Sequence, residues 1–258
     1  MQNASLSSRI ERRLHNMLWA REPLGWDLKS GLKVEVANTA EWILYGEIFV
    51  DGEYDFAIRR ALEVAGGSPM MNVVDLGANV GFFAKRLVDR ILTAHGPEYP
   101  FRAILVEGSP ACAAELRRRV GRDPAVSSRV RVEHGLAGLR TGAAKIYEHA
   151  FHAANSVNNP VMAREGKGTE VKFVDLMELT RDMDRIHLLK CDIEGSELQM
   201  LESYPDLLAK VDTMVMELHP VLCDVARCRQ LLADAGLTRR TIIRGDMPEQ
   251  LVEHFDRG

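Results

Sequence analysis

Short apolar runs that alternate with helical segments constrain the fold of this chain more than any other feature. From about residue 55 onward, runs of four to six apolar residues recur, and stretches of helical periodicity separate them. Such short, continuous runs are typical of strands buried on both faces of a parallel sheet, whose crossover connections are helices. We therefore predict an α/β domain. The predicted strands are Met70–Val74, Ala103–Val106, Val130–Glu133, Ile186–Lys190 and Thr213–Met216.

The two ends of the chain have other patterns. Residues 241–244 and 250–255 are strand-like runs on either side of a short turn, which predicts an antiparallel hairpin. Residues 145–147 and 171–174 are further short strands that flank a polar loop. Near the N-terminus, apolar residues at helical spacing over residues 10–18 predict an amphipathic helix. We assign residues 1–44 to an N-terminal helical cap or arm, or a lid over a substrate cleft, and residues 45–258 to the main domain.

The composition excludes several classes of protein. The chain is 46% hydrophobic and 27% charged, as in ordinary soluble globular domains. Its formal net charge of −4 argues against a nucleic-acid partner, since such proteins usually carry a basic excess. No apolar run approaches the roughly 18 residues that span a bilayer, so we expect no membrane segment. The four cysteines form no C-x-x-C pair, which favours free thiols in the cytoplasm.

A glycine loop follows the first predicted strand. Gly77 and Gly81 are four residues apart, and Asp75 comes two residues before the first of them. This spacing differs from the dinucleotide fingerprint, and an acid there would repel a pyrophosphate. It suits a ligand with positive charge, such as the amino group and sulfonium of S-adenosylmethionine. Glu107, at the end of the next predicted strand, is placed to accept hydrogen bonds from two ribose hydroxyls.

Carboxylates also follow two later predicted strands. Asp192 and Glu194 follow one strand, and Glu217 and His219 follow the next along the chain. If these strands are neighbours, the four side chains converge beside the reactive methyl group. One of them could take a proton from an acceptor hydroxyl, with His219 titrating nearest neutral pH. Several together could instead hold a divalent metal, such as Mg²⁺ on Asp192 and Glu217. A structural hydrogen bond is the alternative role for His219, and a helix-start acid the alternative for Glu194.

These segments resemble the FkbM-type S-adenosylmethionine-dependent methyltransferases, a branch of the class I methyltransferase fold. The resemblance covers about residues 45–220. Its most distinctive part is the lysine–x–aspartate–x–glutamate–glycine core at Lys190–Gly195. The other matching segments are Asp75–Gly81, Val106–Pro110, Glu133–Ala137, Asn155–Val157, Val174–Leu179 and Glu217–Pro220.

The resemblance implies a Rossmann-like, seven-stranded, mostly parallel sheet with helices on both faces and a terminal antiparallel hairpin. It also implies two sets of site residues. The cofactor contacts are expected at Asp75, Gly77, Ala78, Asn79, Gly81, Glu107, Gly108, Ser109, His134, Gly135, Leu136 and Asp192. The candidate catalytic residues are Asp192, His219, Glu194, Glu217 and Lys190.

The leading expectation is an S-adenosylmethionine-dependent enzyme that methylates a hydroxyl on a small molecule, a natural product or a saccharide. Family members commonly methylate such hydroxyls. An N-methyltransferase acting on an amine and a cofactor-binding module without turnover are the alternatives. A homo-oligomer is compatible with the sequence, which does not name the acceptor.

Overall fold

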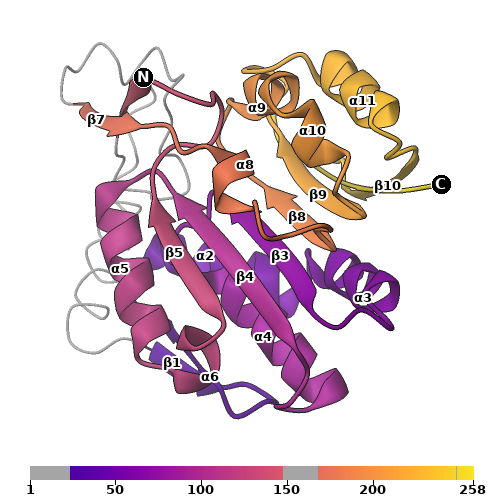
Figure 1. Ribbon diagram of the computed structural model, residues 1–258. Coiled ribbons are helices and arrows are strands. Elements are labelled where there is room, and N and C mark those ends of the chain that lie inside the picture. The colour runs from indigo at the N-terminus through magenta and orange to yellow at the C-terminus, as the bar shows by residue number, and fades with distance from the viewer. Residues whose placement is uncertain (1–23, 148–167, 248) are drawn as a thin grey trace.

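The computed structural model describes residues 24–147, 168–247 and 249–258 (Figure 1). The helix expected over residues 10–18 and the matching segment at 155–157 lie outside these ranges. A seven-stranded sheet forms the centre, with the strand order β10-β11-β9-β8-β3-β4-β5. Its strands are β3 (Met71–Leu76), β4 (Phe101–Glu107), β5 (Val130–His134), β8 (Leu188–Cys191), β9 (Thr213–Leu218), β10 (Arg239–Arg244) and β11 (Leu251–Asp256).

The strand directions confirm the mostly parallel sheet and its terminal hairpin. The pairs β3·β4, β3·β8, β4·β5 and β8·β9 are parallel, whereas β11 is antiparallel to both β9 and β10. Every residue of β3 and of β9 is buried, because helices cover both faces of the sheet. This burial on both sides explains why their sequences are nearly continuous apolar runs.

Two apolar clusters, one on each face, form the core. The first packs α3 (Asp55–Val64), α4 (Phe82–His95) and α5 (Pro110–Gly121) against the sheet, through residues such as Leu87 and Leu116. The second packs four helices on the other face, through residues such as Met200 and Leu232. These helices are α8 (Leu176–Leu179), α9 (Glu197–Ser203), α10 (Pro205–Leu208) and α11 (Val225–Asp234). The short α6 (Pro124–Ser127) follows α5.

The described N-terminal segment is not wholly helical. An antiparallel hairpin of β1 (Leu24–Asp27) and β2 (Lys33–Val36) precedes α2 (Thr39–Tyr45) and the π-helical turn η1 (Gly46–Val50). Four-residue strands with mixed exposure are too short to give a clear alternating pattern, so sequence periodicity does not reveal them. Val34 and Val36 are buried in the same cluster as α4. The domain boundary at residues 44 and 45 stays a prediction.

A second small sheet lies beside the loop that follows β5, and the bridge between Leu136 and Phe173 joins the two. It pairs β6 (Ala143–Ile146) with β7 (Thr169–Lys172), close to the two short strands expected from the sequence. Across the described ranges, no helix combines the length and the apolar character needed to cross a membrane.

Candidate active site

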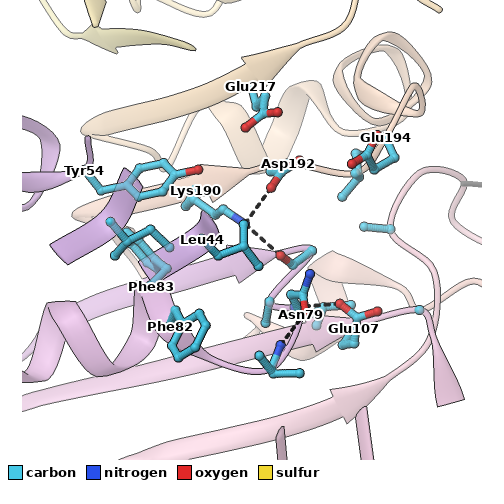
Figure 2. A pocket seen from close by; sticks show the side chains of 18 of the residues that line it. Leu44, Tyr54, Asn79, Phe82, Phe83, Glu107, Lys190, Asp192, Glu194 and Glu217 are labelled. Carbon is cyan, nitrogen blue, oxygen red and sulfur yellow. Dashed lines mark hydrogen bonds and ion pairs between the residues drawn. The ribbon is translucent and has the colours of Figure 1, made fainter. Parts of the chain in front are cut away.

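A pocket of about 300 Å³ opens at the carboxyl ends of β3, β4, β8 and β9 (Figure 2). The loops that follow these strands line it, and residues of α2 and η1 form a further wall. Glu107 and Asn79 lie on one side of it, and Asp192, Glu194 and Glu217 lie on the other. The carboxyl edge of an open parallel sheet is the usual place for a ligand.

Glycine is required where the β3 loop meets the end of β8. Gly77 has a φ of 77°, and a Cβ built on it would lie 1.6 Å from the backbone oxygen of Asp192. Only glycine therefore allows the glycine loop to lie against the loop that follows β8 and carries Asp192. Asn79 also has a positive φ, of 50°, which turns its backbone N–H toward the carboxylate of Glu107.

Glu107 is held by the backbone on both of its oxygens. Its Oε2 accepts a hydrogen bond from Asn79 N at 2.7 Å, and its Oε1 accepts one from Ser109 N at 2.7 Å. Burial raises the pKa of Glu107 to about 7, although these two backbone hydrogen bonds favour the charged form. A carboxylate has about four lone-pair sites, so two remain for hydroxyl groups in the pocket that it lines.

Lys190 connects the glycine loop to the acidic side of the pocket. Its Nζ donates to the carbonyl of Gly77 at 2.7 Å and lies 3.3 Å from Asp75 Oδ1 and 3.4 Å from Asp192 Oδ2. Burial opposes its charge, but the carboxylates of Asp75, Asp192 and Glu217 outweigh that effect and raise the pKa of Lys190. Lys190 is thus a buried cation that positions the loop and Asp192.

Asp75 does not lie at the surface of the pocket, where it was expected to contact the cofactor. Its side chain is fully buried beneath the glycine loop and does not line the pocket. Burial raises the pKa of Asp75, and Lys190 opposes that rise. Asp75 therefore acts on the pocket through Lys190 rather than by touching a ligand there.

His219 lies among carboxylates, just after β9. Its Nδ1 is 2.9 Å from Glu197 Oε1, and its Nε2 is 3.4 Å from Glu194 Oε2 and 3.5 Å from Glu217 Oε1. Burial lowers the pKa of His219, but the three carboxylates outweigh it and raise the value to about 11. The expectation that His219 titrates near neutral pH is therefore wrong for this environment. A ring with both nitrogens protonated has no lone pair to accept a proton.

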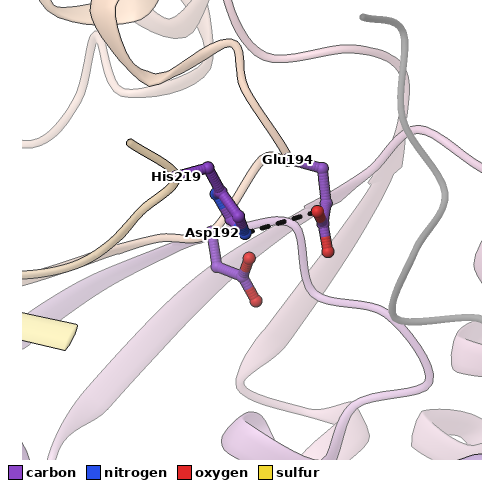
Figure 3. A group of neighbouring side chains, drawn as sticks. All are labelled: Asp192, Glu194 and His219. Carbon is purple, nitrogen blue, oxygen red and sulfur yellow. Dashed lines mark ion pairs between the residues drawn. The ribbon is translucent and has the colours of Figure 1, made fainter. Parts of the chain in front are cut away.

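Glu194 and Glu217 complete the acidic side of the pocket. Burial, with Asp192 as the next cause, raises the pKa of Glu194 to about 8, and the same two causes raise the pKa of Glu217. Glu194 has a φ of 51°, in the left-handed region that favours glycine. This conformation places its carboxylate next to the imidazole of His219 (Figure 3).

The expected cofactor residues other than Asp75 divide into two groups. Those that line the pocket are Gly77, Ala78, Asn79, Glu107, Gly108, Gly135, Leu136 and Asp192. Gly81, Ser109 and His134 lie behind it and support it. Gly81 is the N-cap of α4, Ser109 caps α5 by accepting a hydrogen bond from Cys112 N, and the ring of the exposed His134 lies 3.2 Å from the carbonyl of Gly108.

Three charged residues of the site were not expected from the sequence. Arg244 of β10 lies 3.1 Å from both Glu47 and Glu53 and 3.7 Å from Glu217. Glu47 and Glu53 line the pocket, and burial raises the pKa of Glu53 to about 7. Only tertiary packing brings the hairpin against η1, so no local motif signals these residues.

Comparisons with solved structures give low sequence identities. Methyltransferase FkbM from Methylobacillus flagellatus KT is 16% identical, over 96% of this chain and 60% of that chain, with a TM-score of 0.48. The METTL16 methyltransferase domain is 11% identical, over 98% and 96% of the two chains, with a TM-score of 0.50. Magnesium protoporphyrin IX methyltransferase from Synechocystis PCC 6803 is 12% identical over all of both chains, with a TM-score of 0.48.

A search among curated proteins finds no match. The model of one protein family, described as the methyltransferase FkbM domain, matches residues 75–237. That range is more than half of the chain, and it contains the glycine loop, Glu107 and the acids that follow β8 and β9. The expected resemblance is confirmed: the chain belongs to the FkbM family of S-adenosylmethionine-dependent methyltransferases.

Proposed function

We propose that this protein transfers the methyl group of S-adenosylmethionine to a hydroxyl of a small molecule, a natural product or a saccharide. One observation carries the proposal: a single pocket joins the glycine loop and Glu107 to the carboxylates of Asp192, Glu194 and Glu217.

The four cysteines are free thiols, which fits a reducing compartment, and we place the enzyme in the cytoplasm.

The cofactor side of the pocket fits a nucleoside with a positively charged tail. S-adenosylmethionine supplies a methyl group on a sulfonium, ready for displacement by a nucleophile. Glu107 would accept hydrogen bonds from the ribose hydroxyls, because both of its oxygens are fixed by backbone N–H groups. The glycine loop gives the backbone close access, and the acid wall favours the positive charge of the sulfonium.

The acceptor side would orient a hydroxyl and accept its proton. Orientation of two reactants can lower a barrier by about 7–11 kcal/mol, and a general base adds about 10²–10⁴-fold. Asp192 is the acid whose backbone touches the glycine loop, and its Oδ2 lies 3.4 Å from the ammonium group of Lys190. We assign to Asp192 the positioning of the acceptor oxygen and the acceptance of its proton, with Glu194 and Glu217 completing the carboxylate set.

The test is a transfer assay with the full chain. S-adenosylmethionine labelled in its methyl group is incubated with small-molecule and saccharide fractions, and mass spectrometry locates the label. We expect the label on oxygen. At saturating cofactor, Asp192→Asn should lower kcat by about 10²-fold or more, the range for loss of a base. The matched control is Asp182→Asn, since Asp182 is an exposed acid paired with Arg102, away from the pocket.

Other outcomes would identify the alternatives. Five carboxylates line the acceptor side, and such a wall attracts an ammonium group, so N-methylation is the second candidate. Label on nitrogen would establish it. Cofactor binding without transfer to any fraction would mean a binding module, and an absence of cofactor binding would overturn the proposal altogether. The carboxylates of the wall are Glu47, Glu53, Asp192, Glu194 and Glu217.

A further inference from the structure

Three side chains place ligand atoms around one point on the acidic side of the pocket. A carboxylate oxygen of Asp192, one of Glu194 and a ring nitrogen of His219 all lie within 4.8 Å of one another (Figure 3). Asp192 and Glu194 follow β8, and His219 follows β9. The parallel pairing of these neighbouring strands brings the three residues together.

The carboxylate of Glu197 orients the imidazole of His219. Its Nδ1 lies 2.9 Å from Oε1 of Glu197, whose side chain is completely buried at the start of α9. Gly195 N donates to the same oxygen at 3.0 Å, which fixes the carboxylate in turn. A carboxylate that holds one ring nitrogen and leaves the other directed into a cluster of acids is the arrangement found behind metal-binding histidines.

The charges around this point favour a cation. The side chains of Glu217 and His219 are 7% and 9% exposed, and that of Glu194 is 22% exposed, so water screens them weakly. Lys190, which pairs with Asp192, also serves Asp75 and the carbonyl of Gly77. Several partly buried carboxylates so close together are costly unless a cation is shared among them.

We propose that Asp192, Glu194 and His219 bind a divalent transition-metal ion, which displaces the proton from Nε2 of His219. Carboxylate oxygens alone suit Mg²⁺ and Ca²⁺, whereas an imidazole ligand shifts the preference toward ions such as Mn²⁺ and Zn²⁺. The ligand set differs from the Mg²⁺ pair expected from the sequence, since Glu217 is directed at Arg244 and His219 instead. Both carboxylates of the set line the pocket, so an acceptor that carries oxygen atoms could complete the coordination.

Direct binding of the ion tests the proposal without methyl transfer. The full chain is stripped with a chelator and titrated with Mn²⁺, and electron paramagnetic resonance measures the free ion. We expect one bound ion, displaced by Zn²⁺ at concentrations where Mg²⁺ does not displace it. Glu194→Gln and His219→Gln should each weaken Mn²⁺ binding at least tenfold, and Glu197→Gln about 10–100-fold, as for a residue that orients a ligand.

Two controls separate a lost ligand from a damaged fold. Glu202→Gln, an exposed acid on the same helix as Glu197, should bind Mn²⁺ as the wild type does. Each variant must also keep its melting temperature, and Asp192→Asn replaces any variant that does not fold. A wild type that binds no Mn²⁺, or a folded His219→Gln that binds it unchanged, would overturn the proposal. Because the readout is ion binding, this failure is distinct from a failure of methyl transfer.

Discussion

At the scale of single residues, Glu107 is the side chain that we propose binds the ribose of the cofactor. Burial raises its pKa to about 7, while hydrogen bonds from Asn79 N and Ser109 N hold its two oxygens in place. A ribose needs the ionised form, because only a carboxylate can accept hydrogen bonds from both hydroxyls. Binding of the cofactor should therefore compete with binding of a proton.

The affinity for S-adenosylmethionine should rise with pH. A group with a pKa of about 7 is mostly protonated at pH 6 and mostly ionised at pH 8, so affinity should increase about tenfold over that range. Glu107→Gln should remove this dependence and weaken binding by about 1–3 kcal/mol. Calorimetry at both pH values measures both effects. Glu133→Gln, an acid outside the pocket, is the control, and a wild-type affinity independent of pH would refute the role of Glu107.

At the scale of elements, Arg244 ties the terminal hairpin to η1. It is the cation shared by Glu47 and Glu53, and its own side chain is only 15% exposed. Removing one partner of a buried ion pair leaves the other charges uncompensated, which commonly costs about 3–5 kcal/mol. The hairpin thus holds the acceptor wall of the pocket in place.

Arg244→Met should lower the free energy of unfolding by about 3 kcal/mol at pH 8. The loss should be smaller at pH 6, because Glu53, with a pKa near 7 in the wild type, is mostly protonated there. Urea unfolding at the two pH values measures the difference. Arg239→Met on the same strand is the control: Arg239 is 61% exposed, and its pair with Asp256 should contribute less than about 1 kcal/mol. Equal losses for the two variants would contradict a special role for Arg244.

The positions of the site residues on strands, helices and loops explain which parts of the site could be predicted from the sequence. Asp192 and Glu217 end neighbouring buried strands, so their convergence follows from the apolar runs before them. Arg244 and Glu53 meet only because the hairpin packs near η1, and no periodicity encodes that contact. The charge of His219 could not be predicted either, because it depends on the position of Glu197 at the start of α9.

At the scale of the whole molecule, the stability of the fold should depend on pH through His254. This residue of β11 is 1% exposed, packs edge-on against Phe56 of α3, and has no hydrogen-bond partner on either ring nitrogen among the described residues. Burial lowers its pKa from 6.5 to about 4; Asp256 opposes this shift and Arg60 adds to it. His254 is therefore neutral in the folded chain, whereas it gains a proton on unfolding below pH 6.5.

This difference destabilises the fold as the pH falls. The stability that neutral His254 contributes is complete above pH 6.5 and is lost progressively as the pH falls toward 4. At pH 5 the loss amounts to about 2 kcal/mol. His254→Phe should therefore reduce the loss of stability between pH 7.5 and pH 5 by about 2 kcal/mol, measured by urea unfolding. His95→Phe, at an exposed position on α4, should keep the wild-type pH dependence. If both variants behaved alike, burial of His254 would not be the cause.

The wall of the pocket formed by α2 and η1 lies outside the segment that defines the family. The family match covers residues 75–237, and the glycine loop, Glu107 and the acids Asp192, Glu194 and Glu217 fall within it. Ile43, Glu47 and Glu53 precede that segment, and Arg244, which holds the two acids, follows it. Under the proposed function, the reaction chemistry and the choice of acceptor would therefore be encoded in separate stretches of the chain. We therefore expect related enzymes to differ in substrate through their terminal segments while they share the same catalytic centre.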